Sequence, residues 1–479
     1  MIAPTTSHER QGEHMLKVIR GGTVVTASDT VKADVLIDGE QIAAVGAIGA
    51  VDAETIDAAG CFVLPGLIDN HTHMSMPFGG TTSADDYDTG TQAAAAGGVT
   101  CIVDFGLQME PNGLQSSLEQ WLGRAEGTAH VDYGFHMAIT KADDQTFKDM
   151  QAMVDQGVSS FKVFLAYKDA LMVTDDLFVT ALERSVEVGG IVQVHAENGW
   201  VIDHLVRRAL GEGNTAPIYH ALTRPESVEA EATSRAIRLA EMAGAPVYIV
   251  HVSCEASARE IIAARARGVH VFGETCIQYL FLDINDLKRP APEGARYVCS
   301  PPLRDASNQD FMWDALNFGH LQSISTDHCP FNDEQKALGK DDFSKIPNGL
   351  SAIQHRLALM WEHGVKTGRM SPSKLVDVTS TAIAKQFGMH PQKGTIAPGA
   401  DADLVIFDPN REHRFSLETA FSNVGYDIFD GQRTSGSARQ TLSRGTVVFD
   451  NGAILTKPGH GRFVKRGPFN AALHGDTKA

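Results

Sequence analysis

The chain has few cysteines, and none occurs in the pairs that build disulfide frameworks or small metal sites. Its 479 residues include six scattered cysteines and no C-x-x-C pair. This spacing argues against a disulfide-stapled secreted scaffold. We therefore expect a protein of a reducing compartment, with a cytoplasmic location, whose cysteines pack within apolar strands.

Long hydrophobic runs and a basic surface are also missing. No stretch reaches the roughly 18 uncharged apolar residues of a membrane span. The polar start, MIAPTTSHERQGEH, lacks the apolar core of a signal peptide. With 41 basic and 59 acidic side chains the formal net charge is −18, and no basic stripe offsets it. We therefore expect neither a nucleic-acid partner nor a membrane partner.

The composition is that of a globular protein, with 43% hydrophobic and 21% charged residues. Both ends of the chain alternate short β-rich runs with glycine and aspartate turns, whereas the middle behaves differently. We expect four regions: a disordered N-terminus at 1–14, a composite β-sandwich from 15–65 and 388–460, a barrel at 66–387, and a C-terminal tail at 461–479 that is an arm or disordered.

Between about residues 60 and 330, apolar strand candidates alternate with helical stretches. The strand candidates read CFVLPGLIDNH, VTCIVDF, VDYGFHMAI, SSFKVFLAY, IVQVHAE, APVYIVHVS, VHVFGETC and LQSISTDH. Strands that alternate with helices indicate a parallel sheet, and about eight such units suit an α/β fold of the (β/α)8 TIM-barrel type. A doubly wound sheet is the alternative, but no strand is followed by a G-x-G-x-x-G turn.

Five of these strand candidates end in potential metal ligands. The residues are His71, His73, Lys162, His195, His251 and Asp327. In a barrel the C-terminal strand ends converge on one rim, where active sites lie. A lone histidine at a strand end is more often a packing residue, but two residues with a period of two, as in H-T-H, face the same way. We leave His136, His204, His220 and His328 as packing or supporting residues, and Glu274 as a structural one.

Lys162 is the unusual member of this set. A buried, unpaired lysine is forced towards its neutral amine, which can add carbon dioxide and become an anionic carbamate. That group could bridge two metals as a carboxylate would, whereas the alternative is a lysine stem packed on the barrel wall. Four histidines, one aspartate and one carbamate suit two divalent ions, and we expect Zn²⁺.

At this point the sequence resembles the dihydropyrimidinase and D-hydantoinase family of the amidohydrolase superfamily. The resemblance runs from about residue 15 to residue 465. It is carried by HTHMSMPFGGTTSADD, GGVTCIVDF, FKVFLAYKD, VHAENGWVID, PIYHALTRP, GETCIQYL, CSPPLR and KGTIAPGADADLVIFDP.

The resemblance implies a role for each matching position. His71 and His73 would bind the more buried metal, whose shell Asp327 completes, while His195 and His251 would bind the other, with Lys162 as carbamate between them. Tyr167 would hydrogen-bond the reacting carbonyl. Main-chain groups at Ser300 and Asn348 would hold the cyclic amide of the substrate. Family members are commonly tetramers, so we expect a homotetramer.

The reaction implied is the ring opening of dihydropyrimidines or 5-substituted hydantoins to N-carbamoyl amino acids. A hydroxide between the metals would attack the amide carbon, and Asp327 would pass the proton to the leaving nitrogen. We expect a partly apolar pocket wall from Met74, Met76, Phe78, Phe164 and Leu171, with packing under a loop as the equal alternative for each.

Three other functions are considered. Dihydroorotase would place an arginine soon after the His-x-His pair, where Met74, Ser75 and Met76 follow here. Allantoinase is disfavoured by FLAYKD and CSPPLR. A dihydropyrimidinase-related scaffold would lack metal ligands, whereas this chain has all six.

Overall fold

A computed structural model of the protein describes residues 16–109, 113–141 and 143–469. Eight parallel strands form the central sheet, each paired with the next along the chain. They are β8 (Leu67–Thr72), β11 (Val99–Leu107), β12 (Asp132–Ala138), β13 (Ser160–Phe164), β14 (Ile191–His195), β15 (Val247–Ile249), β16 (Val271–Cys276) and β17 (Ser323–Ser325). The predicted TIM-like barrel is confirmed, with each strand inside or overlapping its expected run.

Two contacts bring the edge strands β8 and β17 together. The fully buried guanidinium of Arg356 donates to the carbonyl oxygens of Ile324 at 2.7 Å and Ile68 at 2.9 Å. Thr72, the last residue of β8, and His328, just beyond β17, also form a parallel bridge. The sheet is therefore nearly closed, and its C-terminal strand ends face one rim.

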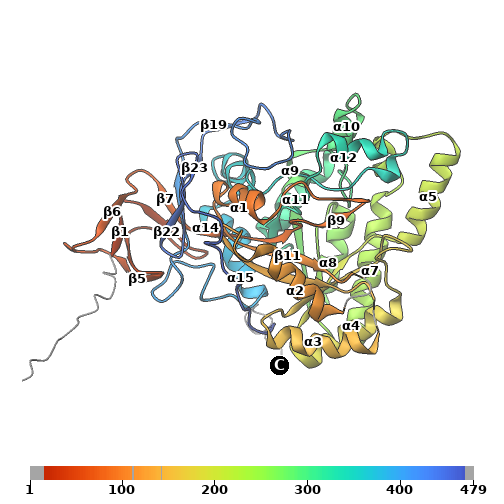
Figure 1. Ribbon diagram of the computed structural model, residues 1–479, viewed down its shortest axis with the longest axis horizontal. Coiled ribbons are helices and arrows are strands. Elements are labelled where there is room, and N and C mark those ends of the chain that lie inside the picture. The colour runs from red at the N-terminus through yellow and green to blue at the C-terminus, as the bar shows by residue number, and fades with distance from the viewer. Residues whose placement is uncertain (1–15, 110–112, 142, 470–479) are drawn as a thin grey trace, which may run out of the picture.

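Helices surround the sheet (Figure 1). Those of eight or more residues are α1 (Tyr87–Ala96), α2 (Leu114–Ala125), α3 (Asp144–Asp155), α4 (Asp175–Val188), α5 (Gly199–Gly211), α7 (Glu226–Ala243), α8 (Glu255–Ala266) and α11 (Ser307–Asn317). The shorter ones are α6 (Ile218–Leu222), α9 (Gln278–Phe281), α10 (Glu293–Arg296), α12 (Asp333–Lys336), α13 (Arg356–Met360), α14 (Pro372–Val376) and α15 (Ala382–Gln386). Local sequence sets their ends: the Asp86 carboxylate caps the start of α1, and Gly244 ends α7 in the left-handed conformation.

The two chain ends together build a pair of sheets at one end of the molecule (Figure 1). One sheet has the order β5 (Gln41–Gly46), β4 (Asp34–Asp38), β1 (Lys17–Arg20), β6 (Glu54–Asp57). The other runs β23 (Ala453–Ile454), β22 (Thr446–Asp450), β21 (Ser437–Ser443), β18 (Leu404–Asp408), β7 (Phe62–Pro65), β2 (Thr23–Val25), β3 (Thr30–Lys32). Ile19 and Val35 of the first sheet share a buried cluster with Val63 and Leu404 of the second.

The two-sheet module built from the chain ends is not purely antiparallel. β1 pairs in parallel with β6, and β2 pairs in parallel with β7. The expected first barrel strand is also two strands, β7 in the sandwich and β8 in the barrel, which are separated at Gly66. A Cβ atom there would lie 2.1 Å from Thr100 Oγ1, so only glycine allows the chain to pass between the two modules.

The described part of the C-terminal tail is an ordered arm. Backbone amides of Val464, Arg466 and Phe469 donate to carbonyl oxygens along the N-terminal side of the barrel strands. The expectations for 1–14 and for the end of the tail, 470–479, lie outside the described residues. Within the described part of the chain, no helix combines the length and apolarity needed to cross a membrane.

Candidate active site

The C-terminal ends of the barrel strands surround a pocket that brings all the predicted site residues together. Its lining includes His71, His73, Lys162, Tyr167, His195, His251, Ser300, Asp327 and Asn348. These nine positions span almost 280 residues of sequence, yet the parallel strands deliver them to one rim because every strand ends on the same side. The pocket is the natural candidate for an active site.

The backbone is strained at three of these positions. Tyr167, His251 and Asp327 have φ angles of 62°, 40° and 50°, which is a region that residues with a side chain seldom adopt. Each lies just beyond a strand, where the chain turns out of the sheet. Such strain clusters at functional sites, where the surrounding structure holds side chains in a required direction.

The first half of the site is a compact group of two imidazoles and one carboxylate. Nε2 of His71 lies 3.1 Å from Asp327 Oδ1, and Nε2 of His73 lies 3.0 Å from the same oxygen. One ligand atom from each residue lies within 4.8 Å of the others. Nε2 of His71 and Nδ1 of His73 are buried and make no hydrogen bond among the described residues.

Electrostatics keep Asp327 and His73 in the protonation states that bind metal; burial alone would lower the pKa of His71, but Asp327 and Glu274 raise it above its ordinary value. Burial alone would raise the pKa of Asp327, but His71 and His73 hold it well below the ordinary value, so the carboxylate is charged. Burial lowers the pKa of His73 to about 4, which leaves its imidazole neutral. A charged carboxylate and a neutral imidazole are the forms that bind divalent ions.

The second half of the site is apolar around its lysine. Nζ of Lys162 lies 4.4 Å from the ring centre of Phe105 and 5.2 Å from that of Phe164. Burial lowers the pKa of Lys162 to about 8, with Asp327 opposing the shift. The rings of His195 and His251 meet edge to face at 4.5 Å, and Nδ1 of buried His251 has no hydrogen-bond partner among the described residues.

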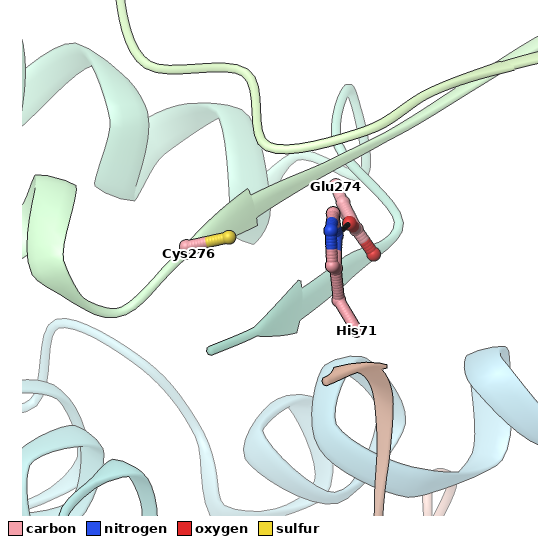
Figure 2. Close-up of side chains that lie close together, drawn as sticks. All are labelled: His71, Glu274 and Cys276. Carbon is pink, nitrogen blue, oxygen red and sulfur yellow. Dashed lines mark hydrogen bonds and ion pairs between the residues drawn. The ribbon is translucent and has the colours of Figure 1, made fainter. Parts of the chain in front are cut away.

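A carboxylate that the sequence analysis left as structural supports His71 from behind. Glu274 Oε1 contacts Nδ1 of His71, and Glu274 Oε2 accepts a hydrogen bond of 3.0 Å from Tyr248. Figure 2 shows Glu274 against the imidazole, with Cys276 farther along the same strand. Glu274 already contacts Nδ1 of His71, and burial raises the pKa of the Cys276 thiol, which disfavours the thiolate form. His71, Glu274 and Cys276 are therefore better explained as a group that supports His71 than as a separate metal site.

Glu197, which is not among the predicted site residues, supports His195 in the same way. Glu197 Oε2 lies 2.8 Å from Nε2 of His195, and both side chains are buried. The signal was present in the sequence, because H-A-E repeats the period of two that singled out His71 and His73.

The same pocket has a wall with hydrogen-bonding groups. Nδ2 of Asn348 donates to Ser300 Oγ at 3.0 Å, and Nε2 of His220 lies 3.0 Å from the same oxygen. Burial raises the pKa of Tyr167, so its hydroxyl remains a hydrogen-bond donor.

The apolar wall is nearly as expected. Met76, Phe78, Phe164 and Leu171 line the pocket. The expectation for Met74 is wrong: its fully buried side chain packs against Gly90 of α1, where a Cβ atom would lie 2.2 Å from the sulfur.

The residues present fit a pair of divalent cations. Imidazole nitrogens of His73 and His251 that make no hydrogen bond with the described residues, a charged carboxylate and a buried lysine converge on the pocket. Carboxylates behind His71 and His195 fix the orientation of their rings. Imidazole and carboxylate donors suit zinc and neighbouring transition metals.

Comparison with known proteins gives one consistent picture. Residues 62–448 match the model of the amidohydrolase family. A D-hydantoinase of Geobacillus stearothermophilus is 47% identical over 96% of this chain and 98% of its own. A dihydropyrimidinase of Rattus norvegicus is 42% identical over 96% and 91%. The solved dihydropyrimidinase of Brevibacillus agri superposes with a TM-score of 0.94 at 52% identity, covering 95% of this chain and all of that one.

Proposed function

The chain belongs to the amidohydrolase family, and from that premise we propose that it hydrolyses the cyclic amide bond of dihydropyrimidines or 5-substituted hydantoins to give N-carbamoyl amino acids. One observation carries the proposal: all nine residues predicted to bind metal or substrate line a single pocket. The relatives named D-hydantoinase and dihydropyrimidinase, which match almost the whole chain, support the same reaction.

Two divalent ions, which we expect to be zinc, would be held by the barrel rim. The ligands would be His71, His73 and Asp327 for one ion and His195 and His251 for the other, with Lys162 carboxylated between them. When bound, such ions act as Lewis acids and lower the pKa of water to near neutrality. The low pKa of Lys162, caused by burial, supports carboxylation because only the neutral amine reacts with carbon dioxide.

Asp327 would carry the proton through the reaction. Its charged carboxylate accepts a proton from the attacking water as the water oxygen bonds to the ring carbonyl carbon. When the carbon–nitrogen bond of the ring breaks, the same group returns the proton to the departing nitrogen. The ring opens with no net change in the enzyme.

Tyr167, Ser300 and Asn348 would hold the substrate. The Tyr167 hydroxyl keeps its proton and can donate to the carbonyl oxygen as negative charge develops there, an effect of about 3 kcal/mol for a well-placed donor. Backbone groups at Ser300 and Asn348 would bind the amide edge of the ring. Phe78 and Leu171 would cover a substituent on the opposite side.

The test is a ring-opening assay of the metal-loaded protein. We expect N-carbamoyl products from hydantoin, dihydrouracil or both, and loss of activity after chelation with recovery on adding Zn²⁺. A fully metal-loaded protein that opens neither ring would contradict the proposal and favour a scaffold role. The homotetramer and the cytoplasmic location remain predictions from the resemblance and the composition.

A further inference from the structure

A buried lysine outside the proposed ligand set lies directly behind the substrate wall. Lys336, the last residue of α12, is 2% exposed. Its ammonium nitrogen donates to three backbone carbonyl oxygens, those of Val298 at 3.0 Å, Pro347 at 2.7 Å and Gly349 at 2.9 Å. Burial lowers the pKa of Lys336 to about 7, but the three carbonyl acceptors match the three N–H groups of the ammonium form, whereas a neutral amine could satisfy only two of them.

These three carbonyls belong to the two segments that carry the proposed amide-binding residues. Val298 precedes Ser300 by two residues, and Pro347 and Gly349 flank Asn348. The two segments also meet directly, because the amide of Gly349 donates to the carbonyl of Val298 at 2.9 Å and Asn348 donates to Ser300. The ammonium group is therefore a cross-link behind the wall that fixes the separation of its two halves.

The residue before the lysine contacts the hairpin that carries the apolar pocket residue Phe78. Nε2 of Gln335 donates to Thr81 Oγ1 at 2.8 Å and to the carbonyl of Thr82 at 2.6 Å. These threonines form β10 (Thr81–Thr82), which pairs with β9 (Pro77–Phe78). The Phe78 ring of that hairpin packs edge to face on Tyr167 at 5.5 Å. Adjacent side chains of α12 thus anchor the polar and the apolar walls.

We propose that Lys336 is a positioning residue that sets the spacing of the backbone at Ser300 and Asn348 for binding the cyclic amide. The inference rests on the proposed function. Lys336 acts on substrate binding because its contacts are with the amide-binding wall. The main-chain carbonyls that flank Asn348 accept hydrogen bonds from Lys336. Loss of the ammonium group would therefore free a backbone segment of the wall rather than a single side chain.

The test compares two variants of Lys336 with a matched buried lysine. Lys336→Met keeps the length of the side chain and removes the donors, and Lys336→Arg keeps the charge in a planar group that cannot satisfy the same three acceptors. The control is Lys393→Met, since Lys393 is equally buried but its ammonium contacts Asp132, Asp401 and Asp403 beyond the opposite ends of the strands. The measurements are kcat and KM for hydantoin and dihydrouracil, metal content and melting temperature.

We expect both Lys336 variants to bind metal like the unaltered protein and to raise KM at least about tenfold, with a smaller change in kcat, because misplaced binding groups are costly even far from the chemistry. Lys393→Met should lower the melting temperature and leave KM unchanged. Unchanged KM in a folded Lys336 variant would overturn the inference, as would failure of both variants to fold. An unaltered protein that opens neither ring would instead defeat the proposed function.

Discussion

Two buried polar clusters in this molecule each bring three possible metal-ligating side chains together, but only one of them is neutralised by a cation of the chain itself. One cluster, at the barrel rim, consists of His71, His73 and Asp327. The other, at the junction of barrel and sandwich, consists of Asp132, Asp401 and Asp403. In each cluster the three possible ligand atoms lie within 4.8 Å of one another. At the junction, Nζ of Lys393 lies between 2.7 and 3.0 Å from an oxygen of all three carboxylates. At the rim, imidazole nitrogens remain without hydrogen-bond partners among the described residues.

The presence or absence of an internal cation distinguishes a structural cluster from a ligand site. Burial would lower the pKa of Lys393, but Asp403 and its neighbours raise it, so the chain supplies its own permanent cation there. At the rim, burial lowers the pKa of Lys162 to about 8, and its ammonium faces aromatic rings. Buried polar groups are normally satisfied, so unsatisfied ones that converge on a pocket point to an external partner.

Removing the lysine at the rim should have the largest effect. Lys162→Ala should reduce kcat/KM at least about 10⁴-fold, roughly 5 kcal/mol of transition-state stabilisation, because the carbamate proposed between the two ions is lost. Metal content should fall with it. Added acetate or propionate should restore part of both, since a small carboxylate can take the place of the carbamate. Near-normal activity of this variant would falsify the bridging role.

Removing the lysine at the junction should affect folding instead. Lys393→Met removes the cation from Asp401 and Asp403 and leaves Asp132 paired with Arg444 alone, which should lower the free energy of unfolding by about 3 to 5 kcal/mol. Denaturant titration at constant protein concentration measures it. Metal content and kcat/KM per folded molecule should not change, and their loss would show that the two clusters are not independent.

The support behind His71 offers a smaller test. Glu274→Gln keeps the shape of the side chain but removes its charge, so His71 loses its anionic partner. Metal affinity should fall about 10- to 100-fold, as measured by competition with a chelator. The matched control is Glu229→Gln, because Glu229 is equally buried but pairs with Arg304 at 2.7 Å. Equal losses of metal affinity in both variants would contradict a specific support.

The smallest effect is a pH dependence. Because the folded pKa of Lys393 is raised above its ordinary value of 10.5, its stabilisation is complete below pH 10.5 and is lost as pH rises towards the folded pKa. The difference in unfolding free energy between the unaltered protein and Lys393→Met should be constant from pH 6 to 9. It should then shrink by at most about 1.4 kcal/mol per pH unit. A difference that changes between pH 6 and 9 would contradict this pairing.

The barrel, and the meeting of the six proposed ligands at one rim, could be predicted from the sequence because strand periodicity and strand ends are local signals. His71 and His73 could be paired from their spacing alone, and the parallel order of the strands then placed Lys162 and Asp327 beside them. The boundary between the sandwich and the barrel was harder to predict from the sequence. Gly66 divides one apolar run between two modules because Thr100 lies against it, and that is a contact between distant residues.

The places of Lys336 and Met74 could not be predicted for the same physical reason. Lys336 lies in the charged run N-D-E-Q-K, which reads as a solvated surface, and its acceptors are backbone carbonyls from two distant segments. Met74 follows the first ligands in sequence and reads as a pocket residue, but its side chain turns under α1. In each case tertiary packing, rather than local pattern, decides the role.

The most direct measurement is anomalous X-ray diffraction from crystals of the zinc-loaded protein, with the electron density examined at Nζ of Lys162. Two zinc peaks in the rim pocket, among His71, His73, His195, His251 and Asp327, with carboxylate density on Nζ between them, are the predicted result. A bare ammonium with no zinc in the pocket, or zinc bound at the Lys393 junction instead, would contradict it.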